Sequence, residues 1–112
     1  MKQISLLFAL LLCSSFASIR TVSGATSVTT SDDNNIVIGT GSDATFTLGT
    51  VSNGFQTTVI NHGTGTITFS QNIYVGGGKT ITTLGNYPAE MQPGWVGNTI
   101  QLCYDGNMWR AY

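Results

Sequence analysis

Residues 57–70 read TTVINHGTGTITFS, and this stretch decides the fold class. In its second half, Ile67 and Phe69 alternate with threonine and serine, so an extended strand would have one apolar and one polar face. The first half is equally β-branched, and the NHGTG between the halves carries Gly63 and Gly65, which can adopt positive φ. The stretch therefore predicts a β-hairpin, with strands at 56–61 and 64–70.

The same character extends through the rest of the chain. From residue 36 onward, short β-branched and aromatic runs alternate with Gly and Asn, and no stretch keeps a helical period for three turns. The expected strands are 36–38, 44–48, 56–61, 64–70, 73–75, 80–83, 99–104 and 108–112. The sequence predicts one all-β domain over residues 36–112, a small antiparallel β-sandwich or barrel-like fold built from hairpins.

The N-terminal 35 residues differ from this domain. Residues 1–17 have Lys2, then an uncharged apolar run, then the small residue Ala17, which is typical of a secretory signal peptide. Cleavage is expected after Ala17 or after Ala25. The apolar run is shorter than the ~20 residues of a membrane helix, so no stable span is expected after processing. Residues 18–35 are rich in Ser, Thr, Asp and Asn and predict a linker.

Composition excludes some kinds of partner. Charged residues make up 8% of the chain, against about 25% in ordinary soluble domains. No basic patch is present, so binding to nucleic acid through phosphates is not expected. Cys13 lies in the signal-like segment, which leaves Cys103 without a disulfide partner. Stability must come from packing and from self-association into a homo-oligomer.

The residues that could support catalysis or metal binding do not form a recognisable set. His62 and Cys103 could act as base and nucleophile, but no neighbour in the sequence of Cys103 would lower its pKa. One histidine and one thiol do not make a zinc site. The DDNN run at 32–35 does not match the calcium-loop pattern, and Glu90 is the sole glutamate. We therefore expect no enzyme, no catalytic residue, no cofactor and no metal.

The C-terminal IQLCYDGNMWRAY, residues 100–112, predicts a second hairpin. Its two-residue turn is either Asp105-Gly106 or Gly106-Asn107. With either turn, the residues of one face form a core set: Ile100, Leu102, Tyr104, Trp109 and Ala111. The opposite face mixes apolar and polar side chains: Gln101, Cys103, Met108, Arg110 and Tyr112. Such a mixed face is typical of a contact between subunits.

Two aromatic residues in the Pro-containing loop at 85–95 are further candidates for exposure. A flat apolar ring with a polar tip suits contact with a surface glycan or a protein. The complete set of candidate contact or ligand-facing residues is Tyr87, Trp95, Cys103, Met108, Arg110 and Tyr112.

Two longer motifs carry a resemblance to a known family. They are GFQTTVINHGTGTITFS, residues 54–70, and, after a glycine loop, MQPGWVGNTIQLCYDGNMWRAY, residues 91–112. The chain resembles, over about residues 44–112, the small β module at the C-terminal ends of bacteriophage tail-fibre and related virion proteins. The matching positions are Phe55, Asn61, Gly65, Phe69, Pro93, Gly94, Asp105, Gly106 and Trp109. The resemblance implies a non-catalytic structural or attachment module, often used as a trimer.

The predicted function is a non-catalytic, exported structural or interaction module that acts at a cell or particle surface and self-associates. Its expected location is secreted or on the cell surface. Phage fibres normally carry a long shaft and no signal peptide, whereas this module directly follows a signal-like segment. The alternative is a phage virion protein, such as a fibre tip or decoration subunit with an attachment role. A third reading is a secreted carbohydrate-binding or hydrolytic protein.

Overall fold

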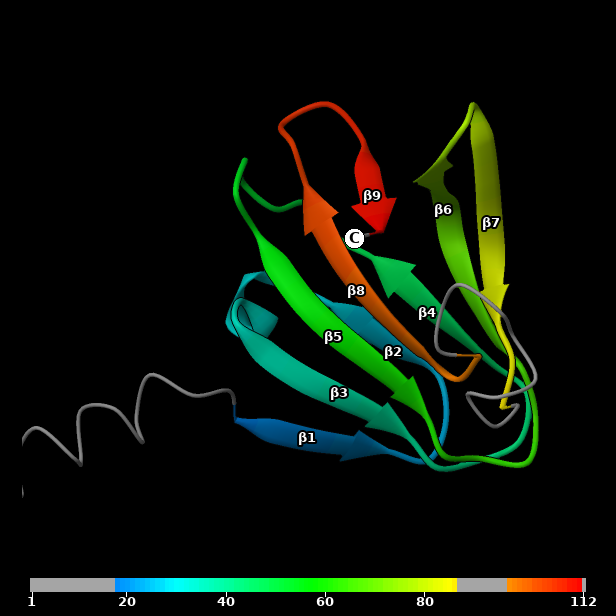
Figure 1. The fold of residues 1–112 in the computed structure, drawn as a ribbon. Helices are drawn as coiled ribbons and strands as arrows, with labels where there is room; N and C mark the ends of the chain where they lie inside the picture. Colours follow the sequence, from blue (N-terminus) through cyan, green and yellow to red (C-terminus); the bar gives the residue numbers. More distant parts are fainter. Residues whose placement is uncertain (1–17, 87–96, 112) are drawn as a thin grey trace, which may run out of the picture.

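The computed structural model describes residues 18–86 and 97–111. Nine strands occur in these ranges: β1 (Ile19–Val22), β2 (Thr26–Val28), β3 (Asn35–Gly39), β4 (Ala44–Leu48), β5 (Gln56–Asn61), β6 (Ile67–Gly76), β7 (Lys79–Leu84), β8 (Thr99–Tyr104) and β9 (Trp109–Ala111). One 3₁₀ turn, η1 (Thr30–Asp32), connects β2 to β3. The predicted all-β class is confirmed (Figure 1). Within the described ranges, no helix has the length and apolar composition to cross a membrane.

The first six strands alternate between two walls of the molecule. Strands β1, β3 and β5 pair in parallel in the front wall of Figure 1, and β2, β4 and β6 pair in parallel in the other wall. Each successive pair of strands is one coil, and equivalent positions stack. Val37 lies beside Val59, and Phe46 lies beside Phe69, one coil further along the chain. The route is that of a short two-sheet β-solenoid of three coils.

The C-terminal hairpin joins the two walls. Strand β8 pairs with β5 in the front wall, β9 pairs with β6 in the other wall, and β8 pairs with β9. The strand order β1-β3-β5-β8-β9-β6-β4-β2 makes a nearly closed, barrel-shaped sheet, which confirms the predicted barrel-like form. Strand β7 lies off this path and pairs with β6.

The core fills the space between the walls. Inward positions alternate with outward ones along β3, β4 and β5, as the strand period requires. The buried apolar side chains are Val28, Val37, Phe46, Leu48, Val51, Phe55, Val59, Ile67, Phe69, Ile73, Leu84, Ile100, Leu102 and Trp109. Asn61 is also buried, and its Nδ2 donates to the carbonyls of Gly65 and Leu84 at 2.9 Å each. That amide satisfies backbone groups where the chain turns between the walls.

The predicted hairpin at residues 56–70 is wrong. Strand β5 pairs with β3 and β8, whereas β6 pairs with β4, β7 and β9. The NHGTG stretch is a corner that carries the chain from one wall to the other, so its glycines do not return the strand onto itself. Of the eight strand pairs among the described residues, five are parallel. The expectation of a mainly antiparallel, hairpin-built sheet is therefore also wrong.

The predicted linker at residues 18–35 is folded instead. It contains β1, β2 and η1, and β1 and β2 supply the first rung of each wall. These two short strands bury little apolar surface, but they pair their backbone with the next coil. Backbone pairing with a neighbouring coil does not need the apolar content whose absence suggested a linker.

Glycines allow the corners of successive coils to stack closely. A Cβ atom on Gly41 would overlap the carbonyl of Ser23, and a Cβ on Gly63 would overlap the carbonyl of Gly41. The backbones also bond directly: Thr64 N–H donates to the Gly41 carbonyl at 2.9 Å. The three corners therefore form a column of backbone in which side chains have no room at these two positions.

Candidate interaction surface

The C-terminal hairpin has the faces that its sequence predicts. Tyr104 lies opposite Trp109 and Cys103 opposite Arg110, which is the register of a Gly106-Asn107 turn. Gly106 has a positive φ of 89°, as a turn with Gly at its first central position requires. Ile100, Leu102 and Trp109 are buried with Tyr104 and Ala111 packed against them, so the core face is confirmed, and Arg110 on the opposite face is exposed. Tyr87, Trp95 and Tyr112 lie outside the described residues.

Asp105 stabilises the turn and forms an ion pair with Arg110 on the mixed face. Its Oδ1 accepts hydrogen bonds from the N–H groups of Asn107 and Met108 at 2.8 Å each. Its Oδ2 accepts from Nε of Arg110 at 2.6 Å. The hydrogen bond from Arg110 and those from Met108 and Asn107 lower the pKa of Asp105 from 3.8 to about 2. The charge of Arg110 is therefore paired within its own chain.

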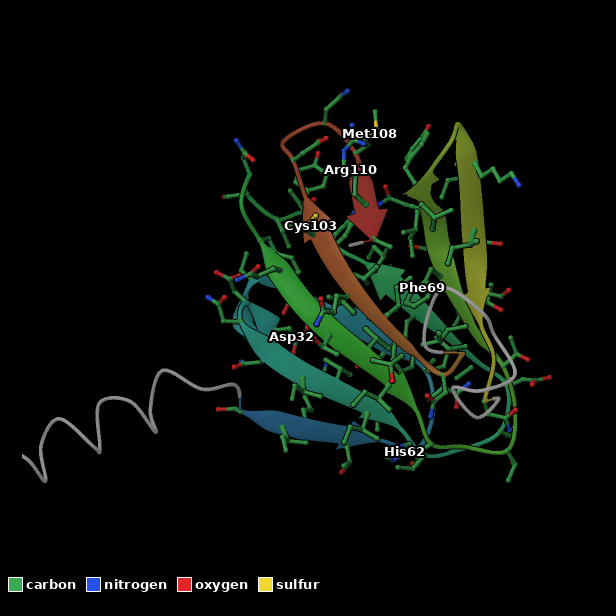
Figure 2. The ribbon with its side chains drawn as sticks, in the orientation of Figure 1. Asp32, His62, Phe69, Cys103, Met108 and Arg110 are labelled. Atoms are coloured by element: carbon green, nitrogen blue, oxygen red, sulfur yellow. The ribbon has the colours of Figure 1, made fainter. Side chains whose placement is uncertain are left out.

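Cys103 lacks the environment of a nucleophile. Its side chain is half-buried, and burial, followed by the charge of Asp105, raises the pKa of its thiol. His62 lies at the opposite end of the strands (Figure 2). Cys103 pairs with Gln56 at the start of β5, whereas His62 follows the end of β5, a separation of about 20 Å at ~3.3 Å per residue. The structure does not bring these two residues together.

The outer surface of the front wall carries four isoleucines among polar residues, and all of them are in register. Two rows of outward side chains cross its four strands. One row is Ile19, Ile36, Thr58 and Gln101, and the other is Thr21, Ile38, Ile60 and Thr99. We call these eight residues the isoleucine face. Ile19 is 63% exposed, and the other three isoleucines are half-buried beside one another.

The opposite wall has a different outer surface. Five of its outward positions are exposed hydroxyl residues: Ser27, Thr45, Thr47, Thr68 and Thr83. They are also in register, because Ser27 pairs with Thr47 and Thr68 lies between Thr45 and Thr83. We call this set the hydroxyl face. Further along β6, Tyr74 and Val75 are also exposed. Outward positions of the front wall thus include four isoleucines, whereas the matching strands of the other wall have Ser or Thr there, although β geometry accepts β-branched residues of either kind.

A cleft opens where β4 and β9 approach β6. It has a volume of about 190 Å³ and is lined by Leu48, Gly49, Thr50, Val51, Gln71, Tyr104 and Trp109. Ligand pockets are usually larger, ~300–1,000 Å³. Trp109 is 1% exposed, and its ring packs edge-on against Phe55 with centroids 5.6 Å apart. Trp109 therefore offers no open face on which a sugar could stack.

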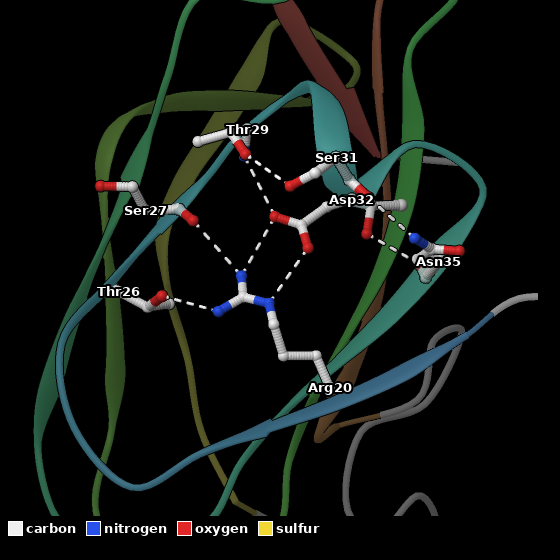
Figure 3. Close-up of polar contacts among 8 residues, drawn as sticks. Arg20, Thr26, Ser27, Thr29, Ser31, Asp32 and Asn35 are labelled. Carbon is white, nitrogen blue, oxygen red and sulfur yellow. Dashed lines mark hydrogen bonds and ion pairs between the residues drawn. The ribbon is translucent and has the colours of Figure 1, made fainter.

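A polar cluster lies inside the first coil (Figure 3). Arg20 Nε and Nη2 donate to the two carboxylate oxygens of Asp32 at 3.1 and 3.0 Å, and Nη1 donates to Thr26 Oγ1 at 2.8 Å. Nη2 also reaches the Ser27 carbonyl at 3.3 Å. The cluster links β1 to β2, the two unpaired ends of the strand order. It is a structural link, and no group of three metal-ligating side chains occurs in the described part of the chain.

The sequence reasoning missed the isoleucine face because it missed an internal repeat. Residues 37–47 read VIGTGSDATFT and residues 59–70 read VINHGTGTITFS, which share the pattern V-I-x-x-G, a short gap, and T-F. These segments occupy the same places in successive coils. The repeat was the available signal for a solenoid, and it places Ile38 and Ile60 side by side.

Comparison with protein-family models, with curated proteins and with solved structures finds no match to this chain. The resemblance to the tail-fibre module therefore stays a prediction.

Proposed function

We propose that this chain is a non-catalytic structural or interaction module that self-associates at a cell or particle surface. The observation that carries the proposal is the isoleucine face, an in-register apolar surface on one wall of the solenoid, next to a hydroxyl face on the other. Contiguous apolar patches on a protein surface are often functional, and contact with a partner is their usual role. The separation of His62 from Cys103 gives no support to a nucleophilic mechanism.

Sedimentation velocity of the full chain over a range of concentrations tests the proposal. We expect the mean mass to rise with concentration. A monomer at all concentrations up to the millimolar range would contradict self-association. A screen of glycosidase and esterase substrates tests the non-catalytic part, and turnover that is lost in a Glu90→Gln variant would overturn it.

Whether the module is exported or assembled into a virion is decided by the mass of the native protein. An intact N-terminus favours a virion subunit, such as a fibre tip. Loss of a leader favours export, and the fold supports one of the two expected cleavage positions. Cleavage after Ala25 would remove β1 and with it Arg20, whereas cleavage after Ala17 leaves all the described strands. We therefore expect an exported form to begin at Ser18.

A further inference from the structure

The apolar rows point to a specific mode of self-contact, and this inference rests on the proposed function. We propose that the isoleucine face binds the isoleucine face of a second copy of this chain, with the two front walls stacked face to face about a two-fold axis. Sheets pack in this way at a spacing of about 10 Å, with their inner side chains interdigitated.

The charge distribution favours a second copy as the occupant. A two-fold contact brings a surface against itself, so an unpaired charge close to the axis would meet its own copy. No Lys, Arg, Asp or Glu belongs to the isoleucine face. The two arginines on its strands or at its edge are already paired in their own chain, Arg20 with Asp32 and Arg110 with Asp105. The face therefore meets a copy of itself without electrostatic conflict.

The contrast with the hydroxyl face identifies which residues make the contact. Both walls consist of stacked parallel strands, and both accept β-branched side chains at outward positions. The hydroxyl face has Thr45, Thr47 and Thr68 at such positions, whereas β3 and β5 of the front wall have Ile36, Ile38 and Ile60 beside Thr58. Isoleucine differs from threonine there mainly in its larger apolar surface. That surface stabilises the protein only when a contact removes it from water. Ile38 and Ile60, adjacent at the centre of the face, are the residues expected to contribute most.

The size of the face sets the strength of the contact. Four strands ~4.8 Å apart, with four or five residues each at ~3.3 Å, cover roughly 300 Å² in projection. A stable interface usually buries about 800 Å² on each partner. The dimer is therefore a weak one, with a dissociation constant in the micromolar range or above, rather than a permanent assembly.

The experiment compares association of the full chain with that of two variants in sedimentation velocity. Ile38→Thr/Ile60→Thr gives the front wall the composition of the hydroxyl face and keeps β-branched residues in the strands. We expect it to fold and to weaken association at least tenfold. Thr47→Lys, on the hydroxyl face, is the control and should associate as the unaltered chain does. Circular dichroism melts of each variant establish that the fold is retained.

The outcomes separate this inference from the proposed function. If the unaltered chain associates and Ile38→Thr/Ile60→Thr associates equally well, another surface makes the contact, and the proposed function stands without this interface. A trimer as the associated species would overturn the two-fold arrangement. If the unaltered chain stays monomeric, self-association itself fails. If the double variant does not fold, Gln101→Lys replaces it as the test, because Gln101 is an exposed residue of the same face. We expect this variant to weaken association at least tenfold. Unchanged association would overturn the proposal.

Discussion

Arg20 occupies a position that is apolar in the later coils. It lies in register with Val37, which in turn lies beside Val59, and both valines are fully buried. Thr26, its partner across the molecule, is in register with Phe46. Among the described residues no coil lies beyond the first, and the Arg20 side chain reaches solvent, so polar residues there end the core. Repeat proteins generally need such polar capping at their terminal units.

Removing the cation of this cap should destabilise the fold. In an Arg20→Met variant, Asp32 stays buried and keeps only the hydrogen bond from Thr29 N–H. We expect a loss of about 2 kcal/mol in the free energy of unfolding, less than the ~3–5 kcal/mol of a fully buried pair, because the Arg20 side chain is 39% exposed. Urea unfolding measures it.

Two variants serve as controls for Arg20→Met. Arg20→Met/Asp32→Asn removes both charges and should lose less stability than the single variant, because no unpaired charge remains inside the coil. Arg110→Met breaks an exposed ion pair and should also lose less. Equal losses in Arg20→Met and Arg110→Met would contradict the capping role.

Asp105 should make the hairpin sensitive to acid. Its pKa of about 2 lies below the ordinary value, so its contribution to stability is complete above about pH 4 and is lost as the pH falls toward 2. Asp105→Asn keeps an oxygen for the turn but no charge for Arg110. We expect the unaltered chain to have the higher melting temperature at neutral pH, and the difference to close between pH 4 and pH 2. A difference that is constant over this range would show that the carboxylate contributes nothing as an ion.

At the scale of the element, alternation predicts where strands lie but not which strands they pair with. The expected ranges 44–48, 56–61 and 99–104 coincide with β4, β5 and β8. Alternation along one strand is a local property, whereas pairing with the next coil depends on residues about one repeat away. The same glycines serve a hairpin loop or a solenoid corner, and only the repeat distinguishes the two. The outer position of Ile38 and Ile60 could not be predicted without that pairing.

The corner column makes a prediction about single glycines. Gly41→Ala places a methyl group where the Ser23 carbonyl lies, so the corners of two coils must separate. We expect a loss of about 2 kcal/mol or more in the free energy of unfolding, as for other overpacked sites. Gly24→Ala is the matched control, because a Cβ there meets no atom within 4 Å, and its change should stay within about 0.5 kcal/mol. Similar losses in the two variants would argue against close stacking at the corner.

At the scale of the whole molecule, the C-terminal hairpin turns an open solenoid into a nearly closed barrel. Without the hairpin, the front wall would end at β5 with an unpaired edge, whereas the other wall already continues from β6 to β7. Strand β8 covers the edge of β5, and β9 covers part of the edge of β6. Trp109 enters the core between the walls. Its ring centroid lies 5.4 Å from that of Tyr104 and 5.6 Å from that of Phe55. The two ends of the solenoid are thus closed differently, one by the Arg20 cluster and one by a hairpin.

This closure predicts that the last strand is essential to the fold. A chain that ends at Met108 loses the Trp109 side chain and the backbone that joins β8 to β6. Loss of a buried tryptophan side chain alone costs about 3–5 kcal/mol, a large part of the ~5–15 kcal/mol that holds a small domain together. We expect the shortened chain to show no cooperative thermal transition, and Trp109→Ala to melt well below the unaltered chain. Arg110→Ala, an outward change in the same strand, should retain a cooperative transition. A soluble, cooperatively melting chain without β9 would show that the three coils are stable without the hairpin.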